Sequence, residues 1–385
     1  MASLLSTFSE TFDRRVAVVS ATAFTFGLLV RSLFVPGKHA YIVPSPLTTL
    51  LPKLSAEERS KLPYPPDSLP GARDVDSPYG SIRVYEFGPE DGRKVLLVHG
   101  ISTPCLALGG VAHQLADKGC RVMLFDLFGR GYSDNPADLP HDLRLFVTQV
   151  LLALASSPLS WKSFSMVGYS FGGGISAGFS SYFPDMIENL VLLCPSGLIR
   201  ARHISRTSRI IYSEGIIPEP LLLSLVKRRL KTPLYPPKPQ KDGDKIGASA
   251  AVKAEVPIES NSTAVLSKKH PNVTIDKAIV HQVDHHVGYV PAFMSSIRYG
   301  PIMQQHALWG RVGETWNGRS AESDKVHKVL IIAGESDSII DAAELREDAA
   351  AVFGAAHIDF HVLGAGHDVP VIKPEEVAEL ISQSL

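Results

Sequence analysis

The stretch FSMVGYSFGGG, residues 164–174, decides the fold of this chain. It begins as an apolar run typical of a buried strand, passes through Gly168, Ser170 and Gly172, and continues into small residues typical of a helix. A Gly-x-Ser-x-Gly sequence between a strand and a helix predicts a sharp turn that holds the serine hydroxyl clear of the backbone. Glycines are needed on both sides because larger side chains would clash in so tight a turn. The hydroxyl then stands near a helix N-terminus, which favours developing negative charge.

The composition describes a globular chain with a sizeable core. Its 385 residues leave room for one large domain with an insertion, or for two ordinary domains. Hydrophobic residues make up 45% and charged residues 20% of the chain, and the formal net charge is −1. This balance gives no reason to expect nucleic acid as a partner. The three cysteines are too few for a disulfide framework, and two of them lie in or beside apolar strand-like runs, where cysteine usually behaves as a small buried hydrophobic residue.

Apolar runs of strand length alternate with helical segments on both sides of the opening stretch. The strands are expected at residues 81–87, 94–98, 121–125, 164–168, 189–193, 326–333 and 358–363. The helices are expected at residues 106–118, 141–156, 171–182, 342–353 and 374–384. Strands that are apolar on both faces and alternate with helices predict a parallel sheet covered on both sides, which is an α/β fold.

The alternation also divides the chain. Residues 76–198 and 321–385 are expected to form the core, and residues 199–320 interrupt it with basic, proline-rich and polar sequence. An insertion between core elements is typical of a lid or cap. Residues 36–75 are rich in proline and are expected to be a linker over the surface, with one short helix announced by the capping-box sequence from Ser55 to Glu58.

Residues 1–35 form a hydrophobic N-terminal segment. Arg14 and Arg15 precede fifteen uncharged residues, Arg31 interrupts, and the apolar run then continues to Val35. We expect residues 16–35 to be a membrane anchor if Arg31 reaches towards the lipid headgroups. A signal peptide and an extra helix packed on the domain are the alternatives. Sequons at Asn261 and Asn272 would suit a glycosylated lumenal or extracellular catalytic domain, with a cytoplasmic location as the alternative.

A serine hydroxyl needs a base, and the base needs an orienting carboxylate. In parallel sheets such groups lie on loops at the carboxyl ends of strands. The last predicted strand ends in a glycine-rich turn that carries His367, and the strand before it is followed by Asp337. The expected order is therefore Ser170, Asp337, His367. Glu335 is an alternative to Asp337, whereas Asp126 begins a loop that is expected to be structural.

Five motifs together resemble the α/β-hydrolase family over residues 75–385. They are His99-Gly100, the loop from Asp126 to Ser133, the turn at Ser170, the run from Gly334 to Asp337, and the run from Gly364 to His367. The resemblance implies an eight-stranded, mostly parallel sheet with helices on both faces and an inserted helical lid. It also implies an oxyanion hole made by the backbone N–H groups of Ile101 and Phe171, with Ser102 as a further contributor. His99 is then a residue that organises its loop.

These features predict a serine hydrolase that cleaves a carboxylic ester, thioester or lactone through an acyl-enzyme. The substrate is expected to be a small and hydrophobic molecule because the lid carries apolar patches. No cofactor and no metal are expected. His281, Asp284, His285 and His286 suggest a metal site, but a lid helix with solvated or packed histidines is the simpler interpretation. Amide or carbon–carbon bond hydrolysis on the same residues, or a non-catalytic binding protein of this fold, are the alternatives.

Overall fold

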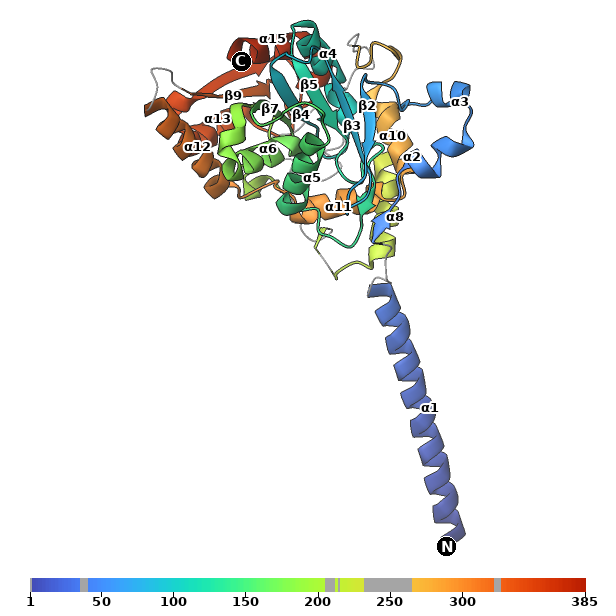
Figure 1. Cartoon of the computed structure of the whole chain (residues 1–385). Helices are drawn as coiled ribbons and strands as arrows, with labels where there is room; N and C mark the ends of the chain where they lie inside the picture. The colour runs from blue at the N-terminus through green and yellow to red at the C-terminus, as the bar shows by residue number, and fades with distance from the viewer. Residues whose placement is uncertain (1, 35–40, 205–211, 214, 232–264, 322–326) are drawn as a thin grey trace.

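The computed structural model describes residues 2–34, 41–204, 212–213, 215–231, 265–321 and 327–385. An eight-stranded sheet lies at its centre (Figure 1), in the order β10-β9-β8-β7-β4-β5-β3-β2. Only the pairings of β2 with β3 and of β3 with β5 are antiparallel, so the predicted mostly parallel α/β sheet is confirmed. The strands are β2 (Ala72–Val75), β3 (Ile82–Phe87), β4 (Lys94–Val98), β5 (Arg121–Phe125), β7 (Phe164–Tyr169), β8 (Ile187–Leu193), β9 (Val329–Gly334) and β10 (Ile358–Leu363). Two further short strands, β1 (Ile42–Val43) and β6 (Asn135–Pro136), pair with each other.

Both faces of the sheet are covered, as the apolar strands predict. Along β4, Leu96 and Val98 pack into one core cluster, while Val95 and Leu97 pack into another on the opposite face. The first cluster includes residues of α5 (Leu143–Ala155), α6 (Phe171–Tyr182) and α13 (Ala342–Phe353). The second includes residues of α4 (Gly109–Asp117) and α15 (Pro374–Ser384). A central strand with both faces covered loses its polar/apolar alternation, because water reaches neither face.

Capping side chains set several helix boundaries. Helix α5 begins after Asp142, whose carboxylate accepts hydrogen bonds from the N–H groups of Arg144 and Leu145 at 3.0 and 3.2 Å. The helix predicted from residue 141 therefore starts two residues later. The capping box at Ser55 and Glu58 is present at the start of α3 (Ala56–Ser60), as its sequence predicts.

Strand β2 lies inside the stretch predicted to be a linker. It is an edge strand with alternately exposed and half-buried residues, and it carries two charges. Arg73 pairs with Glu86 at 2.8 Å, and Asp74 pairs with Arg83 at 2.8 Å. Charged edge strands give little hydrophobic signal, which explains why the sequence did not reveal this strand.

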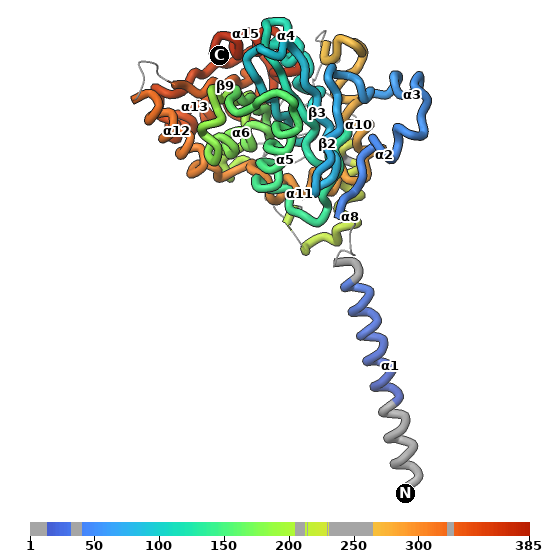
Figure 2. The backbone as a smooth tube through the Cα atoms, viewed as in Figure 1, coloured from blue at the N-terminus to red at the C-terminus, as the bar shows by residue number. Residues whose placement is uncertain are grey.

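Within the described residues of the segment predicted to be a lid, the α-helices are α8 (Glu219–Lys231), α10 (Ile275–His285), α11 (Tyr289–Tyr299) and α12 (His306–Ala321). Helices α8, α10 and α11 pack on one another, and Figures 1 and 2 show α8 and α11 on the side of the sheet from which α1 extends. Helix α12 instead packs on α6 and α13. One part of the insertion therefore belongs to the layer that covers the sheet.

Helix α1 (Ala2–Phe34) extends away from the rest of the chain in Figure 1. Among the described residues we find no helix whose length and apolarity together suffice to cross a membrane. The prediction of a membrane-spanning anchor at residues 16–35 is therefore wrong, and the expected membrane association loses its support. The uncharged run of fifteen residues would rise only about 22 Å as a helix, against about 30 Å of hydrocarbon. Asn261 lies outside the described residues, and Asn272 is exposed.

Candidate active site

Ser170 stands at the turn between β7 and α6. Its φ of 53° and ψ of −116° lie in a region of backbone conformation that residues other than glycine rarely adopt. The backbone holds this conformation: Ser170 donates its N–H to the carbonyl of Leu193 at 2.9 Å and accepts from the N–H of Ser196 at 2.9 Å. A Cβ on Gly172 would lie 2.1 Å from the carbonyl oxygen of Val98. Gly172 therefore allows the turn to pack against the end of β4, and Gly168 allows it to pack against the first turns of α6, where a Cβ on Gly168 would lie 2.4 Å from the Gly172 carbonyl oxygen.

The structure brings Ser170, His367 and Asp337 together. The His367 Nε2 atom lies 2.8 Å from the Ser170 hydroxyl oxygen, and its Nδ1 atom lies 2.7 Å from Asp337 Oδ2. His367 follows β10 and Asp337 follows β9, so both come from carboxyl ends of parallel strands. All three side chains are buried or nearly so. This arrangement can move a proton from the hydroxyl to the imidazole while the carboxylate orients the ring.

The second oxygen of Asp337 is also engaged. Oδ1 accepts hydrogen bonds from the N–H groups of Ile339 and Ile340 at 2.8 and 2.9 Å. These bonds fix the carboxylate so that Oδ2 faces the imidazole. Glu335, the alternative orienting residue, is exposed, and the structure therefore favours Asp337.

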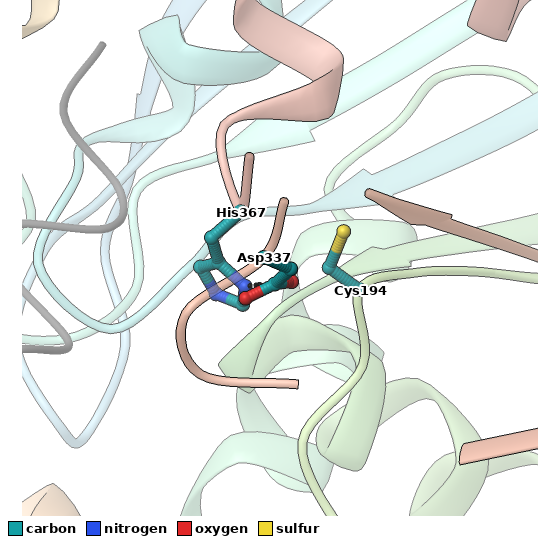
Figure 3. Close-up of side chains that lie close together, drawn as sticks. All are labelled: Cys194, Asp337 and His367. Carbon is teal, nitrogen blue, oxygen red and sulfur yellow. Dashed lines mark hydrogen bonds and ion pairs between the residues drawn. The ribbon is translucent and has the colours of Figure 1, made fainter. Parts of the chain in front are cut away.

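Cys194 is a neighbour of this group that the sequence did not indicate. Figure 3 shows Asp337 between His367 and Cys194. One ligand atom from each of these three residues lies within 4.8 Å of the others. Burial, and then the charge of Asp337, raise the pKa of the Cys194 thiol well above its usual range. Cysteine binds metal ions as the thiolate, and this thiol is held in its protonated form. The carboxylate and the imidazole beside it are already hydrogen-bonded to each other. These three side chains are therefore poorly suited to bind a metal ion.

The histidines of α10 form a separate feature. The rings of His281 and His285 lie 4.7 Å apart. Burial, and then repulsion from His285, lower the pKa of His281 to about 4. Among the described residues, the possible metal-ligand atoms that lie close together are those of Cys194, Asp337 and His367. The histidines of α10 do not form a second group of this kind.

The loop after β4, residues 100–103, carries the predicted oxyanion-hole residue Ile101. It packs beside the Ser170 turn, because Gly172 lies against the backbone of Val98 and His99. Phe171, the other predicted donor, is the first residue of α6. His99 accepts from the N–H of Leu127 at its Nε2 atom and lies 2.8 Å from the Gly100 carbonyl at its Nδ1 atom. Through these two contacts the ring connects the loop after β4 with the loop after β5, which agrees with its expected role. Burial, and then the charge of Arg130, lower the His99 pKa to about 3.

Asp126 holds a second loop at the end of β5. Its carboxylate accepts hydrogen bonds from the N–H groups of Cys105 and Tyr132, both at 2.9 Å. The Tyr64 hydroxyl donates to it at 3.2 Å. Burial raises the Asp126 pKa. These contacts agree with the structural role expected for this residue.

A cleft of about 630 Å³ lies elsewhere, between Leu69, Phe87 and His113. The lysine ammonium groups at its rim are paired, with Lys268 lying 2.6 Å from Asp117. Ser170, Asp337 and His367 do not line this cleft. The hydrogen-bonded group at Ser170 is the better candidate because it has a nucleophile, a base and an orienting carboxylate in contact.

Known proteins share this fold. A family model for the alpha/beta hydrolase fold matches residues 94–374. The chain belongs to the α/β-hydrolase family. A serine hydrolase-like protein of Danio rerio is 31% identical over 123 residues, which cover 32% of this chain and 37% of that protein. The match thus spans little more than a third of that relative's length.

Solved α/β-hydrolase structures resemble the chain at low sequence identity. A 2-hydroxy-6-oxo-6-phenylhexa-2,4-dienoate hydrolase from Rhodococcus sp. strain RHA1 has a TM-score of 0.58 at 15% identity, covering 81% of this chain and 97% of that one. Carboxylesterase CesB from Bacillus subtilis has a TM-score of 0.55 at 16% identity, covering 81% and 90%. At this identity the likeness is one of fold.

Proposed function

We propose that this α/β-hydrolase cleaves a carboxylic ester, including a thioester or lactone, with Ser170 as the nucleophile. The observation that carries the proposal is the chain of two hydrogen bonds from Ser170 through His367 to Asp337, at 2.8 and 2.7 Å. A serine hydroxyl bonded to an imidazole, whose other nitrogen meets a buried carboxylate, is the arrangement that acyl transfer requires.

The reaction has two steps. The Ser170 oxygen attacks the substrate carbonyl carbon while its proton passes to His367 Nε2, and the backbone N–H groups of Ile101 and Phe171 stabilise the oxyanion. The intermediate collapses when the bond to the leaving alcohol or thiol breaks, and His367 returns the proton to that group. Water then attacks the acyl-enzyme with His367 as base, which releases the acid and restores the Ser170 hydroxyl. Asp337 orients His367 and stabilises its charged form throughout.

A hydrophobic substrate is the class that the surroundings support. Phe171 shares one core cluster with three residues of lid helix α11, Val290, Phe293 and Met294. The rings of Phe146 and Phe171 pack edge to face, with their centroids 5.3 Å apart. Apolar side chains near the nucleophile favour apolar acyl or alcohol groups, because burial of their surface adds binding free energy.

The test is hydrolysis of p-nitrophenyl esters of increasing acyl length, together with labelling by a fluorophosphonate probe. We expect turnover and a single adduct on Ser170 in the full chain, with both lost in Ser170→Ala. Rates should rise from acetate towards medium-chain esters. Hydrolysis at an unchanged rate by Ser170→Ala would overturn the role of Ser170. Failure of the unaltered protein both to label and to hydrolyse any ester would overturn the proposed activity.

A further inference from the structure

The loop at residues 100–103 contains no helix or strand, although it carries the proposed oxyanion donor Ile101. All four residues are buried. Without regular secondary structure, the directions of its N–H groups depend on what holds each carbonyl. A trans peptide unit is planar, so fixing a carbonyl also fixes the N–H of the next residue on the opposite side.

The first peptide unit of the loop is held from within the core. The Nδ1 atom of His99 lies 2.8 Å from the Gly100 carbonyl oxygen. The other ring nitrogen accepts from the Leu127 N–H at 2.8 Å, so Nδ1 carries the proton and donates it to Gly100. This bond orients the peptide unit that contains the Ile101 N–H.

The second peptide unit is fixed by a buried arginine, which is in turn hydrogen-bonded to a residue of the lid. Arg130 is fully buried, and its Nε donates to the Ile101 carbonyl at 3.1 Å. One terminal nitrogen donates to the Phe128 carbonyl at 2.9 Å, and the other donates to the hydroxyl of Ser296 at 2.8 Å. Ser296 belongs to lid helix α11, so this helix helps to fix the peptide unit that contains the Ser102 N–H.

The third unit is held by the lid directly. The Tyr289 hydroxyl, at the start of α11, donates to the Ser102 carbonyl at 2.8 Å. The side-chain amide of Gln282, on α10, donates to the same oxygen at 3.3 Å. The amide oxygen of Gln282 accepts from the Gly131 N–H. These groups are buried, so loss of the Tyr289 hydroxyl leaves the Ser102 carbonyl with only the longer bond from Gln282, and bulk water cannot readily replace the shorter one.

From these contacts we propose that lid helix α11 is part of the oxyanion machinery, with Tyr289 and Ser296 as positioning residues for the loop at residues 100–103. The inference rests on the proposed serine hydrolase activity and goes beyond it. Oxyanion donors act because they are already aimed at the charge that develops in the transition state. A shift of the order of 1 Å in such a site can lower the rate by about a hundredfold. The lid therefore affects the chemical step as well as access to the site.

The experiment compares Tyr289→Phe with the unaltered full-length protein on a p-nitrophenyl ester, with kcat expressed per site titrated by fluorophosphonate. This change removes one hydroxyl and keeps the ring. We expect kcat per titrated site to fall by at least about tenfold while KM stays within about twofold. The inhibition constant of a trifluoromethyl ketone, which forms a hemiketal oxyanion with a serine, should rise by the same factor as kcat/KM falls.

Tyr182→Phe is the matched control, because it removes a hydroxyl from an exposed tyrosine at the end of α6. Its kcat per titrated site should equal that of the unaltered protein. A second variant, Ser296→Ala, releases one nitrogen of Arg130 and should lower kcat in the same direction. If Tyr289→Phe does not fold, the kcat of Ser296→Ala tests the proposed role of helix α11 in its place.

The outcomes separate the two proposals. If the unaltered protein neither labels nor hydrolyses esters, the proposed activity fails, and this inference fails with it. If the unaltered protein is active but both lid variants keep kcat per titrated site and ketone affinity within twofold, only the inference is overturned. Mere structural damage would lower the titratable fraction and the unfolding temperature without changing kcat per active site.

Discussion

Replacing Asp337 by asparagine should trap His367 in the wrong tautomer. The Oδ1 position of Asp337 receives two backbone N–H groups, from Ile339 and Ile340. In Asp337→Asn the amide oxygen must occupy this position, because an NH₂ group there would face two donors. The NH₂ group then points at His367 Nδ1, which must become an acceptor. The proton moves to Nε2, and that nitrogen can no longer accept the proton of Ser170.

The size of the effect follows from the lost base. The side chain keeps its shape and its three hydrogen bonds, so the fold should change little. The corresponding change in a serine protease lowers kcat by about 10⁴, as expected for a wrong tautomer. At about 1.4 kcal/mol per tenfold change, this corresponds to a barrier higher by about 5 kcal/mol. We expect a loss of the same order here.

The assay is the steady-state rate on a p-nitrophenyl ester, with the rate of fluorophosphonate labelling as an independent measure of Ser170 reactivity. Glu335→Gln is the control, since Glu335 is exposed two residues away and should be replaceable with no change beyond about twofold. If Asp337→Asn keeps its rate within tenfold, or if Glu335→Gln loses more, the tautomer argument is refuted.

Further predictions concern the turn at Ser170 and the buried histidines. Gly172→Ala should lower the thermal midpoint and abolish labelling, because the new Cβ would lie 2.1 Å from the Val98 carbonyl oxygen; a variant with unchanged activity would show that the turn can relax. Gly310→Ala, in α12 with nothing within 4 Å of the new Cβ, should leave activity intact and add about 0.4–1 kcal/mol of stability by thermal unfolding. Burial, and then Arg130, lower the pKa of His99 to about 3, and burial lowers that of His286 to about 4. These histidines bind protons near pH 6.5 in the unfolded chain, but only at lower pH in the folded chain. The free energy of unfolding therefore decreases as the pH falls from 6.5 towards 4, by about 2 kcal/mol per histidine at pH 5. Urea unfolding at pH 7.5 and 5.0 measures this loss, and equal midpoints at the two pH values would contradict it.

Much of the sheet can be predicted because its strands are buried on both faces. The bounds at Lys94–Val98 and Arg121–Phe125 agree with the predicted ranges, since each of these strands is a short apolar run that is mostly buried. The bounds at Ile358–Leu363 agree as well, although this strand lies at the edge of the sheet and carries Asp359 and His361. Strand β2 could not be found in this way. It carries charge at the edge of the sheet and is stabilised by ion pairs with β3, which are contacts between segments and leave no local pattern.

The order of Ser170, Asp337 and His367 and their positions after strands are properties of the sequence, because strand ends are marked locally by glycine and by the end of an apolar run. The choice of Asp337 over Glu335 needed the tertiary structure, since it depends on which carboxylate is buried against the imidazole. The sequence alone also suggested a membrane anchor, but among the described residues no helix combines the length and the apolarity needed to cross a membrane.

The sequence by itself thus determined the α/β fold and the turn that presents Ser170, because both follow from local backbone chemistry and from the periodicity of apolar residues. Only the tertiary structure decided what surrounds that turn. The contact of Tyr289 with Ser102 and the nearness of Cys194 to Asp337 join residues that are far apart along the chain. No spacing in the sequence records such contacts, because the first arises from how the inserted helices pack on the core and the second from the pairing of strands β8 and β9.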